Sequence, residues 1–289
     1  MTRHGLSFDV EDWQQLVALR LDGTIGEPSS DIDECVPRIL DLCEQLDVKA
    51  TFFVLGMLAK SRPRLVRSIA AHGHEIASHS LNHKLLYRMT RSELLDDLRG
   101  SKRLLEDLAG GEVKGFRAPE FSVQGLDSPC FEALIEAGFT YDSSVFPVPQ
   151  LRYGVTGAPH LPFEIQTRSG VLVELPLATA RVGPWRIPIA GGSHFRLLPT
   201  WFVKQAASRA DERDEPLVFY FHPYEFTRRW LYAKGGFARN RIVGKYVALH
   251  NFATWRIEQS LRALSEQLDF VPLRDLAVAN ARSTGRTPS

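Results

Sequence analysis

Short apolar segments alternate with longer amphipathic segments along most of the chain. The apolar segments are brief, rich in β-branched and aromatic residues, and bounded by polar or glycine residues, which is typical of buried parallel strands. The pattern predicts five such strands, at Gly5–Val10, Ala50–Leu55, Glu75–Ala77, Val113–Phe116 and Leu217–Phe221.

The segments between these strands carry apolar residues at helical spacing. Over residues 34–46 one helix face is apolar, and Pro37 is compatible with this helix only in its first turn. Thr90, followed by Glu93, has the form of a capping box that opens a helix running to about Leu108. Two further helices are expected at Arg64–Ala71, before Gly73, and at Pro129–Ala137, before Gly138.

Alternation of strands and helices predicts an α/β fold, a parallel sheet or barrel with the helices outside. Loops at the carboxyl ends of such strands meet at one mouth, where a site can form. Residues 145–198 interrupt the alternation, are rich in proline and glycine, and contain the short strand Val171–Leu175. We therefore expect a single domain over residues 1–280, an irregular elaboration over the mouth at 145–198, and a flexible polar tail at 281–289.

Composition narrows the class of protein. The chain has 289 residues, 44% of them apolar, which is enough for one large domain with a substantial core. With 35 basic and 34 acidic side chains the net charge is +1, which argues against a nucleic-acid binder. No apolar run has the length of a membrane span, about 18 residues.

The first residues, MTRHGLSFDVEDW, have acids where a signal peptide has its apolar stretch. The three cysteines fit neither a disulfide framework nor a thiolate zinc cluster. A cytoplasmic location is therefore expected.

Two histidines, His79 and His83, directly follow the third predicted strand. Their spacing lets both side chains reach one metal ion from a single helix or turn, although a solvated pair has the same spacing. Three acids, Asp9, Glu11 and Asp12, end the first strand, where an unpaired buried charge would be costly. A metal site needs such a carboxylate, but an acid here could also cap the next helix or face solvent.

Two more strand ends carry side chains suited to hydrolysis. Arg117, after the fourth strand, could pair with a strand-end carboxylate and keep it ionised, or form a surface salt bridge. His222 ends the strongly apolar strand at 217–221 and is suited to proton transfer near neutral pH, although a core histidine is the alternative.

Taken together and in order, these segments resemble the polysaccharide deacetylases of carbohydrate esterase family 4, the NodB-homology group. The resemblance rests on the acidic end of the first strand, on the segment S-H-S-L-N-H, on F-R-A-P-E-F and on F-Y-F-H-P, which span residues 9–222. The D-V-E-D form of the first segment, together with E-L-P, A-G-G-S and H-P-Y-E-F, is similar to deacetylases encoded beside exopolysaccharide or surface-glycan export genes.

The resemblance implies a distorted (β/α) barrel and a hydrolase that cleaves linear amide C–N bonds of N-acetylated sugars. It implies one divalent metal, zinc above all, held by His79, His83 and a carboxylate. The family has adjacent acids in its first motif, whereas Val10 and Glu11 intervene here; Asp12 is the favoured ligand and Glu11 the alternative.

The resemblance also assigns the remaining roles. Asp9 would be the general base, paired with Arg117, and His222 the general acid. Glu120, with Phe121 after it, stands where the family has an aromatic residue after the proline, and this region would donate a backbone N–H to the oxyanion.

Two other interpretations remain open. The first is a cytoplasmic amidohydrolase of the same fold that acts on a small cyclic amide or ureide. The second is a non-catalytic glycan-binding component, for which a complete set of base, acid, arginine and histidines would be unnecessary. Residues 226–250 contain six cations and no acid, so contact with an anionic glycan or a membrane surface is a further alternative to a solvated basic loop. The sequence leaves the oligomeric state open.

Overall fold

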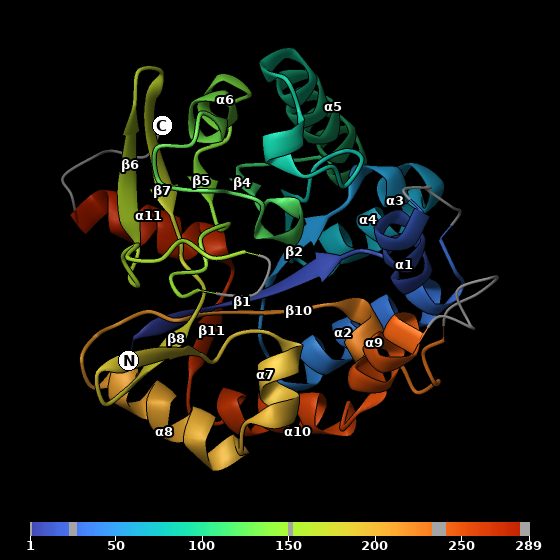
Figure 1. The fold of residues 1–289 in the computed structure, drawn as a ribbon, viewed down its shortest axis with the longest axis vertical. Helices are drawn as coiled ribbons and strands as arrows, with labels where there is room; N and C mark the ends of the chain where they lie inside the picture. Colours follow the sequence, from blue (N-terminus) through green and yellow to red (C-terminus); the bar gives the residue numbers. More distant parts are fainter. Residues whose placement is uncertain (1, 23–27, 150–152, 233–240, 284–289) are drawn as a thin grey trace.

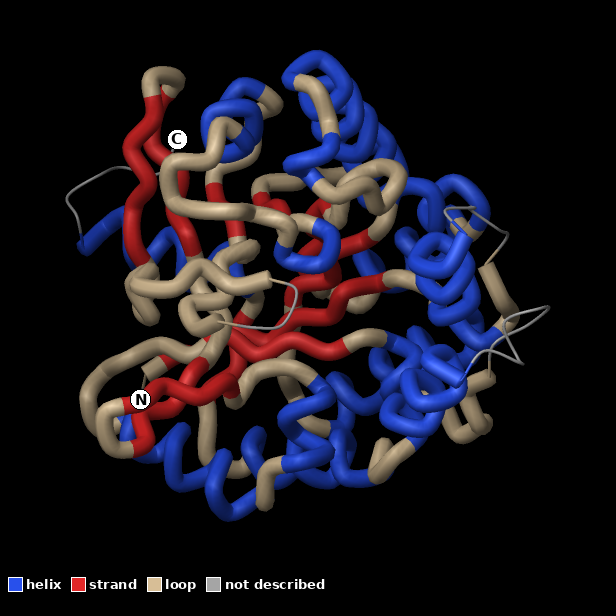
Figure 2. Tube along the Cα trace, in the orientation of Figure 1, coloured by secondary structure: helices blue, strands red, loops and turns tan. Residues whose placement is uncertain are grey.

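The computed structural model describes residues 2–22, 28–149, 153–232 and 241–283. Its centre is one curled sheet with helices around it (Figures 1 and 2). Every strand pair in this sheet is parallel except β6 with β7, and β1 pairs with β2, β10 and β11. In spatial order the strands are β10 (Val218–Phe221), β1 (Arg3–Val10), β2 (Thr51–Val54), β3 (Glu75–Ser78), β4 (Gly115–Phe116), β5 (Tyr141–Asp142), β7 (Gly170–Glu174) and β6 (Phe163–Thr167), with β11 (Asp269–Val271) beside β1. The predicted α/β fold and its five parallel strands are confirmed, in the form of a curled, open sheet.

Helices cover the outside of the sheet (Figure 1). The α-helices are α1 (Trp13–Asp22), α2 (Asp31–Gln45), α3 (Gly56–Ser61), α4 (Pro63–Ala71), α5 (Arg91–Ala109), α6 (Cys130–Glu136), α7 (Gly192–Leu197), α8 (Thr200–Asp211), α9 (Arg241–Asn251), α10 (Trp255–Ser265) and α11 (Leu273–Ser283). Three short 3₁₀ turns are η1 (Leu86–Arg88), η2 (Pro119–Phe121) and η3 (Pro223–Phe226). Each helix that the structure describes is too short or too polar to cross a lipid bilayer.

The four predicted helices form, and two of their ends are informative. The capping box of α5 is confirmed: the Thr90 backbone N–H donates to Glu93 Oε2 at 2.8 Å, and the Glu93 N–H donates to Thr90 Oγ1. Helix α2 begins at Asp31, so the prediction that Pro37 lies in the first turn is wrong. Acids in the first turn of α2 favour the earlier start, because they stabilise the positive end of the helix dipole.

The core fixes the strands so that their carboxyl ends lie at one edge. Strand β1 is buried from His4 to Val10, as expected for a central strand covered on both faces. The Phe8 ring stacks on Phe52 of β2 at 5.0 Å and packs against Phe221 of β10 at 6.1 Å between centroids. These contacts place the ends of β1 and β10 beside each other, and β3 and β4 follow along the same edge.

The segment at 145–198 is more regular than expected. Strands β6 and β7 extend the main sheet past β5, and β8 (Thr179–Val182) forms a separate antiparallel hairpin with β9 (Trp185–Pro188). Helix α11 continues to Ser283, so the first residues of the tail expected at 281–289 are helical; residues 284–289 lie outside the described part of the chain. Helix α11 contacts both β1 and β7 and so spans the open side of the sheet.

Candidate active site

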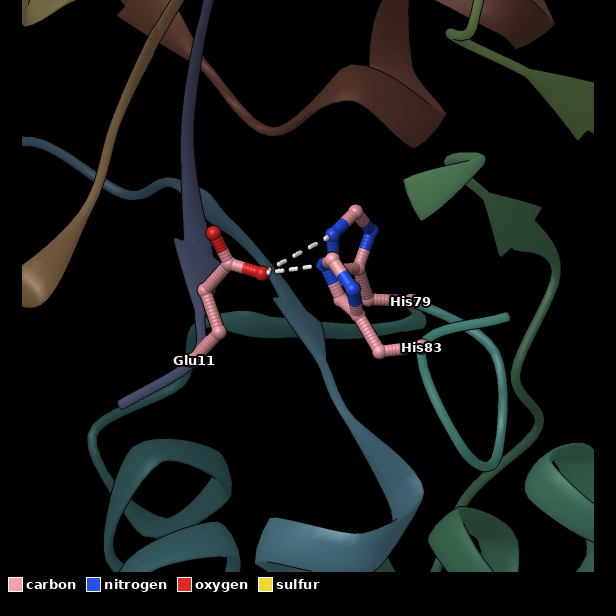
Figure 3. Close-up of side chains that lie close together, drawn as sticks. All are labelled: Glu11, His79 and His83. Carbon is pink, nitrogen blue, oxygen red and sulfur yellow. Dashed lines mark ion pairs between the residues drawn. The ribbon is translucent and has the colours of Figure 1, made fainter. Parts of the chain in front are cut away.

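A carboxylate and two imidazoles converge at the carboxyl edge of the sheet (Figure 3). Glu11 follows β1, and His79 and His83 lie on the loop after β3. Glu11 Oε2 is 2.7 Å from His83 Nε2 and 3.5 Å from His79 Nε2, and all three side chains are buried. One ligand atom from each residue therefore lies within 4.8 Å of the others, which is the arrangement of a metal site.

The acid beside the histidines is Glu11, which corrects the preference for Asp12. Strand β1 ends at Val10, where the chain turns and the Glu11 N–H donates to the Asp9 carbonyl at 3.1 Å; Asp9 and Glu11 both line the site cavity, and Asp12 does not. The Asp12 carboxylate instead accepts the backbone N–H groups of Gln14 and Gln15 at 3.0 and 3.1 Å, and it accepts the Ser29 hydroxyl at 2.6 Å. Asp12 is thus the N-cap of α1.

The loop that carries the histidines is held in an unusual backbone conformation. Ser80 and His83 have φ angles of 65° and 56°, in the left-handed region that non-glycine residues rarely adopt. Asp97 of α5 accepts the N–H groups of Leu81 and Asn82 at 2.8 and 3.2 Å, which fixes the loop. The two histidines therefore share a tight turn, one of the two arrangements that their spacing allowed.

The contacts of the three side chains suit metal ligands better than a hydrogen-bonded cluster. His79 Nδ1 contacts the Arg117 carbonyl oxygen at 2.9 Å, so its Nε2 faces Glu11. His83 Nε2 and Glu11 Oε2 are buried and, despite their short distance, form no hydrogen bond with each other or with any other described residue. Burial opposes ionisation of Glu11, but its histidine neighbours, His83 first, hold the pKa of this carboxyl well below its usual value. A buried, ionised carboxylate next to two imidazoles fits a divalent cation.

Asp9 and Arg117 form a buried ion pair beside this cluster. Arg117 Nη1 donates to Asp9 Oδ1 at 2.7 Å and to Ser7 Oγ at 2.9 Å. Its Nε and Nη2 donate to the backbone oxygen and the hydroxyl of Ser143, and its guanidinium lies 4.1 Å from the centre of the Phe53 ring. The arginine is fully buried with every nitrogen bonded, so it holds the Asp9 carboxylate in one orientation.

His222 lies on the other side of Glu11 and is flanked by two carboxylates. His222 Nε2 is 3.2 Å from Glu11 Oε1, and His222 Nδ1 is 3.7 Å from Glu225 Oε2, which also accepts the His222 backbone N–H. Burial disfavours the protonated ring, but Glu11 and Glu225 outweigh it and raise the pKa of His222 to about 10. The ring stacks on Tyr224 with centroids 4.9 Å apart. The imidazole is thus held as a proton donor.

The pair Gly191 and Gly192 makes room for this arrangement. A Cβ on Gly192 would lie 2.0 Å from Glu225 Oε1, and one on Gly191 would lie 2.7 Å from the Tyr220 ring. Gly191 also has a φ of 83°, which a side chain would strain. Because Gly191 and Gly192 have no side chains, the backbone at the start of α7 can approach Glu225, the carboxylate that orients His222.

Glu120 and Phe121 lie in η2, directly after Arg117, and both line the cavity that contains the cluster. Both have left-handed backbone conformations, with φ of 49° and 51°. The Phe121 N–H donates to the Ala118 carbonyl at 3.0 Å, so this N–H is already engaged within the turn.

The site residues surround one cavity of about 200 Å³. Asp9, Glu11, His79 and His222 all line it, whereas Asp12 does not. Further residues that line the cavity were given no role in the sequence analysis: Tyr153, Ser193, Tyr220, Tyr224, Glu225 and His250. Ser193, Tyr220, Tyr224 and Glu225 stand in the segments A-G-G-S, F-Y-F-H-P and H-P-Y-E-F, whereas no pattern marked Tyr153 or His250.

Comparison with known proteins supports the resemblance. Residues 14–141 match the family described as polysaccharide deacetylase, and residues 143–278 match a family described as a domain of unknown function, DUF3473. A peptidoglycan-N-acetylglucosamine deacetylase from Bacillus cereus is 38% identical over 86 residues, which is 30% of this chain and 31% of that protein. The match thus spans less than a third of that relative.

Two solved structures share the fold. A protein from Mycobacterium smegmatis assigned to the polysaccharide deacetylases has a TM-score of 0.62 and 20% identity, over 100% of this chain and 93% of that one. An allantoinase has a TM-score of 0.61 and 16% identity, over 99% and 93%. At these identities the likeness establishes the architecture, and the choice of reaction depends on the site.

Proposed function

Because this chain belongs, through a domain matched at residues 14–141, to the polysaccharide deacetylases of carbohydrate esterase family 4, we propose that it is a metal-dependent deacetylase. Its substrate would be an N-acetylated sugar of a surface or extracellular polysaccharide, or of its precursor. The observation that carries the proposal is the cluster of Glu11, His79 and His83, two of whose members, Glu11 and His79, line one cavity together with Asp9 and His222.

The candidate metal ligands are Glu11 Oε2 and the Nε2 atoms of His79 and His83. Two imidazoles and one carboxylate suit zinc and leave a coordination position open, as a catalytic site requires. When bound, such an ion would lower the pKa of water and polarise the acetamide carbonyl.

The remaining steps belong to side chains of this chain. Asp9, oriented by Arg117, would take the proton of the attacking water as general base. The backbone N–H of Glu120 would donate to the oxyanion that develops on the carbonyl oxygen. His222, held between Glu11 and Glu225, would protonate the departing sugar nitrogen, and acetate would leave.

The size of the cavity is consistent with this reaction. A volume of about 200 Å³ is below the roughly 300 Å³ of the smaller drug-sized ligand pockets. It would admit an acetamido group and part of its sugar ring, with the rest of a glycan outside. Tyr153, Tyr220 and Tyr224 line the cavity and would supply the apolar and hydroxyl contacts that sugars favour.

The proposal is tested by acetate release from chitooligosaccharides and from peptidoglycan fragments. Asp9→Asn keeps the shape of the side chain but removes the base, and we expect a rate about 10²–10⁴-fold lower than that of the wild type. Asp107→Asn, an exposed change on α5, is the matched control and should have wild-type activity. A chelator should abolish the activity, and added zinc should restore it.

A cyclic ureide such as allantoin, assayed in parallel, separates the proposal from the alternative amidohydrolase. Hydrolysis of the ureide without acetate release from any acetylated sugar would overturn the proposal. So would activity that persists after complete removal of metal.

A further inference from the structure

A second cavity, of about 350 Å³, lies between the hairpin β8–β9 and helix α8, away from the active site. Leu217, which lines this cavity, precedes β10, whereas His222 follows that strand. At about 3.3 Å per residue the strand separates the two cavities by roughly 16 Å. The two cavities share no lining residue.

Four arginines and one carboxylate line this second cavity. Arg181 and Arg186 come from the hairpin, Arg209 and Arg213 come from α8 and the turn after it, and Glu215 is the acid. Among the described residues none of the four arginines is within ion-pair distance of a carboxylate, and the lining carries an excess of three positive charges. The excess of positive charge in this lining contrasts with the whole chain, in which 35 basic and 34 acidic side chains nearly balance.

The four arginines gather positive charge on the two walls of the cavity, which is unfavourable without a ligand. Arg181 and Arg186 stand directly opposite each other in the antiparallel hairpin, where like charges destabilise the strand pair. Arg209, in α8, and Arg213, in the turn after it, add two positive charges to the wall opposite the hairpin. An acid in place of one arginine on each wall would reduce the repulsion, and a bound anion would have the same effect.

The hairpin also presents one guanidinium in a fixed position. Arg186 is half-buried, and its Nη1 donates to Thr179 Oγ1 at 3.1 Å. Burial lowers the pKa of Arg186 from its usual value; Glu215 opposes this shift, and repulsion from Arg181 and Arg213 adds to it. Arg181, on the same hairpin, and Arg213, after α8, therefore both repel the Arg186 guanidinium.

We propose that this cavity, defined by Arg181, Arg186, Arg209 and Arg213, binds a multiply charged oxyanion, namely a phosphate monoester or diphosphate group. Guanidinium groups pair with phosphate oxygens in a bidentate manner, and four of them around one cavity suit a group with more than one negative charge. The group could belong to a soluble phosphate compound or to the head group of a lipid. This anion site and the proposed deacetylase site are roughly 16 Å apart. A molecule bound through its phosphate group would therefore be anchored near the catalytic cavity.

The test uses the full chain and two probes, inorganic pyrophosphate and vesicles of phosphatidylcholine with or without phosphatidic acid. Binding is measured by calorimetry and by co-sedimentation for the wild type, for Arg186→Gln/Arg213→Gln and for Arg67→Gln/Arg103→Gln. The last variant removes two exposed arginines elsewhere, on α4 and α5, and is the matched control. We expect the first double variant to bind at least about tenfold more weakly and the control to bind as the wild type does.

Pyrophosphate binding would identify a soluble ligand, and binding to the acidic vesicles alone would identify a lipid head group. Either result supports the site if the Arg186/Arg213 variant no longer binds that probe. Thermal unfolding at low salt provides a second measure that does not depend on activity. Without anions the Arg186/Arg213 variant should unfold at a higher temperature than the wild type, since the repulsion is relieved, and pyrophosphate should stabilise only the wild type and the control. Equal binding by all three proteins, or binding by none, would overturn the proposal.

Discussion

Asp9 and Arg117 form a buried pair whose interaction free energy, about 2 kcal/mol, can be measured by a double-mutant cycle. Arg117 is fully buried and makes four side-chain hydrogen bonds, one of them to Asp9 at 2.7 Å. Arg117→Met would leave the Asp9 carboxylate buried without its cation, and Asp9→Asn would leave the guanidinium without its anion. Removal of one partner from a buried pair costs about 3–5 kcal/mol.

The double variant Asp9→Asn/Arg117→Met removes both charges, so its cost should fall short of the sum of the single costs. We expect an interaction energy of about 2 kcal/mol, within the range known for residues in contact. This is a large part of the stability of a typical domain, about 5–15 kcal/mol.

The assay is equilibrium unfolding in urea at neutral pH, with a chelator present so that metal binding does not add to the stability of any variant. The control cycle uses Arg91 and Glu136, a pair at 2.5 Å in which the arginine is 53% exposed, and it should give less than about 1 kcal/mol. An interaction energy below about 0.5 kcal/mol for Asp9 with Arg117, equal to or below the control, would refute the argument that this pair is a tightly coupled, buried unit.

Two further predictions concern the carboxylates around the site. Glu225→Gln removes the charge beside His222 Nδ1 while keeping an acceptor for the His222 backbone N–H. In steady-state kinetics kcat should therefore fall by about tenfold with little change in KM. An unchanged kcat would contradict this role of Glu225. Burial, and then the charge of Asp142, raise the pKa of Glu174 well above its usual value of 4.5. The stability that Glu174 contributes is therefore fully present below about pH 4.5 and is lost as the pH rises through its raised native pKa. The thermal stability of the wild type should thus fall as the pH rises above about 4.5, and it should fall more than that of Glu174→Gln; parallel profiles would show that Glu174 is not the group responsible.

The sequence predicted the central half of the fold because the relevant signals are local. Strands such as β1 and β10 are buried on both faces, so their apolar runs appear in the sequence directly. The capping box of α5 and the acids at the ends of strands are equally local features. The hairpin β8–β9 was missed because each of its strands has only four residues and most of these residues are exposed or half-buried, so no buried apolar run marks it.

The candidate site was predicted in outline and missed in one ligand for a physical reason. The family pattern favoured an aspartate, whereas the turn after β1 brings Glu11 to the histidines and leaves Asp12 to cap α1. Some side chains that orient the site come from distant segments, as Ser143 does for Arg117. Their partners are set by the packing of the sheet, which no local pattern records.

The central claim is that Glu11, with His79 and His83, holds a metal ion, and zinc binding by two paired variants tests it most directly. Asp12→Asn keeps the cap of α1, because asparagine caps a helix as well as aspartate, and Glu11→Gln keeps the size of the side chain while removing its charge. We expect one zinc per chain in the wild type and in Asp12→Asn, and zinc affinity weaker by more than about tenfold in Glu11→Gln. Full zinc binding by Glu11→Gln, together with its loss in Asp12→Asn, would contradict the account.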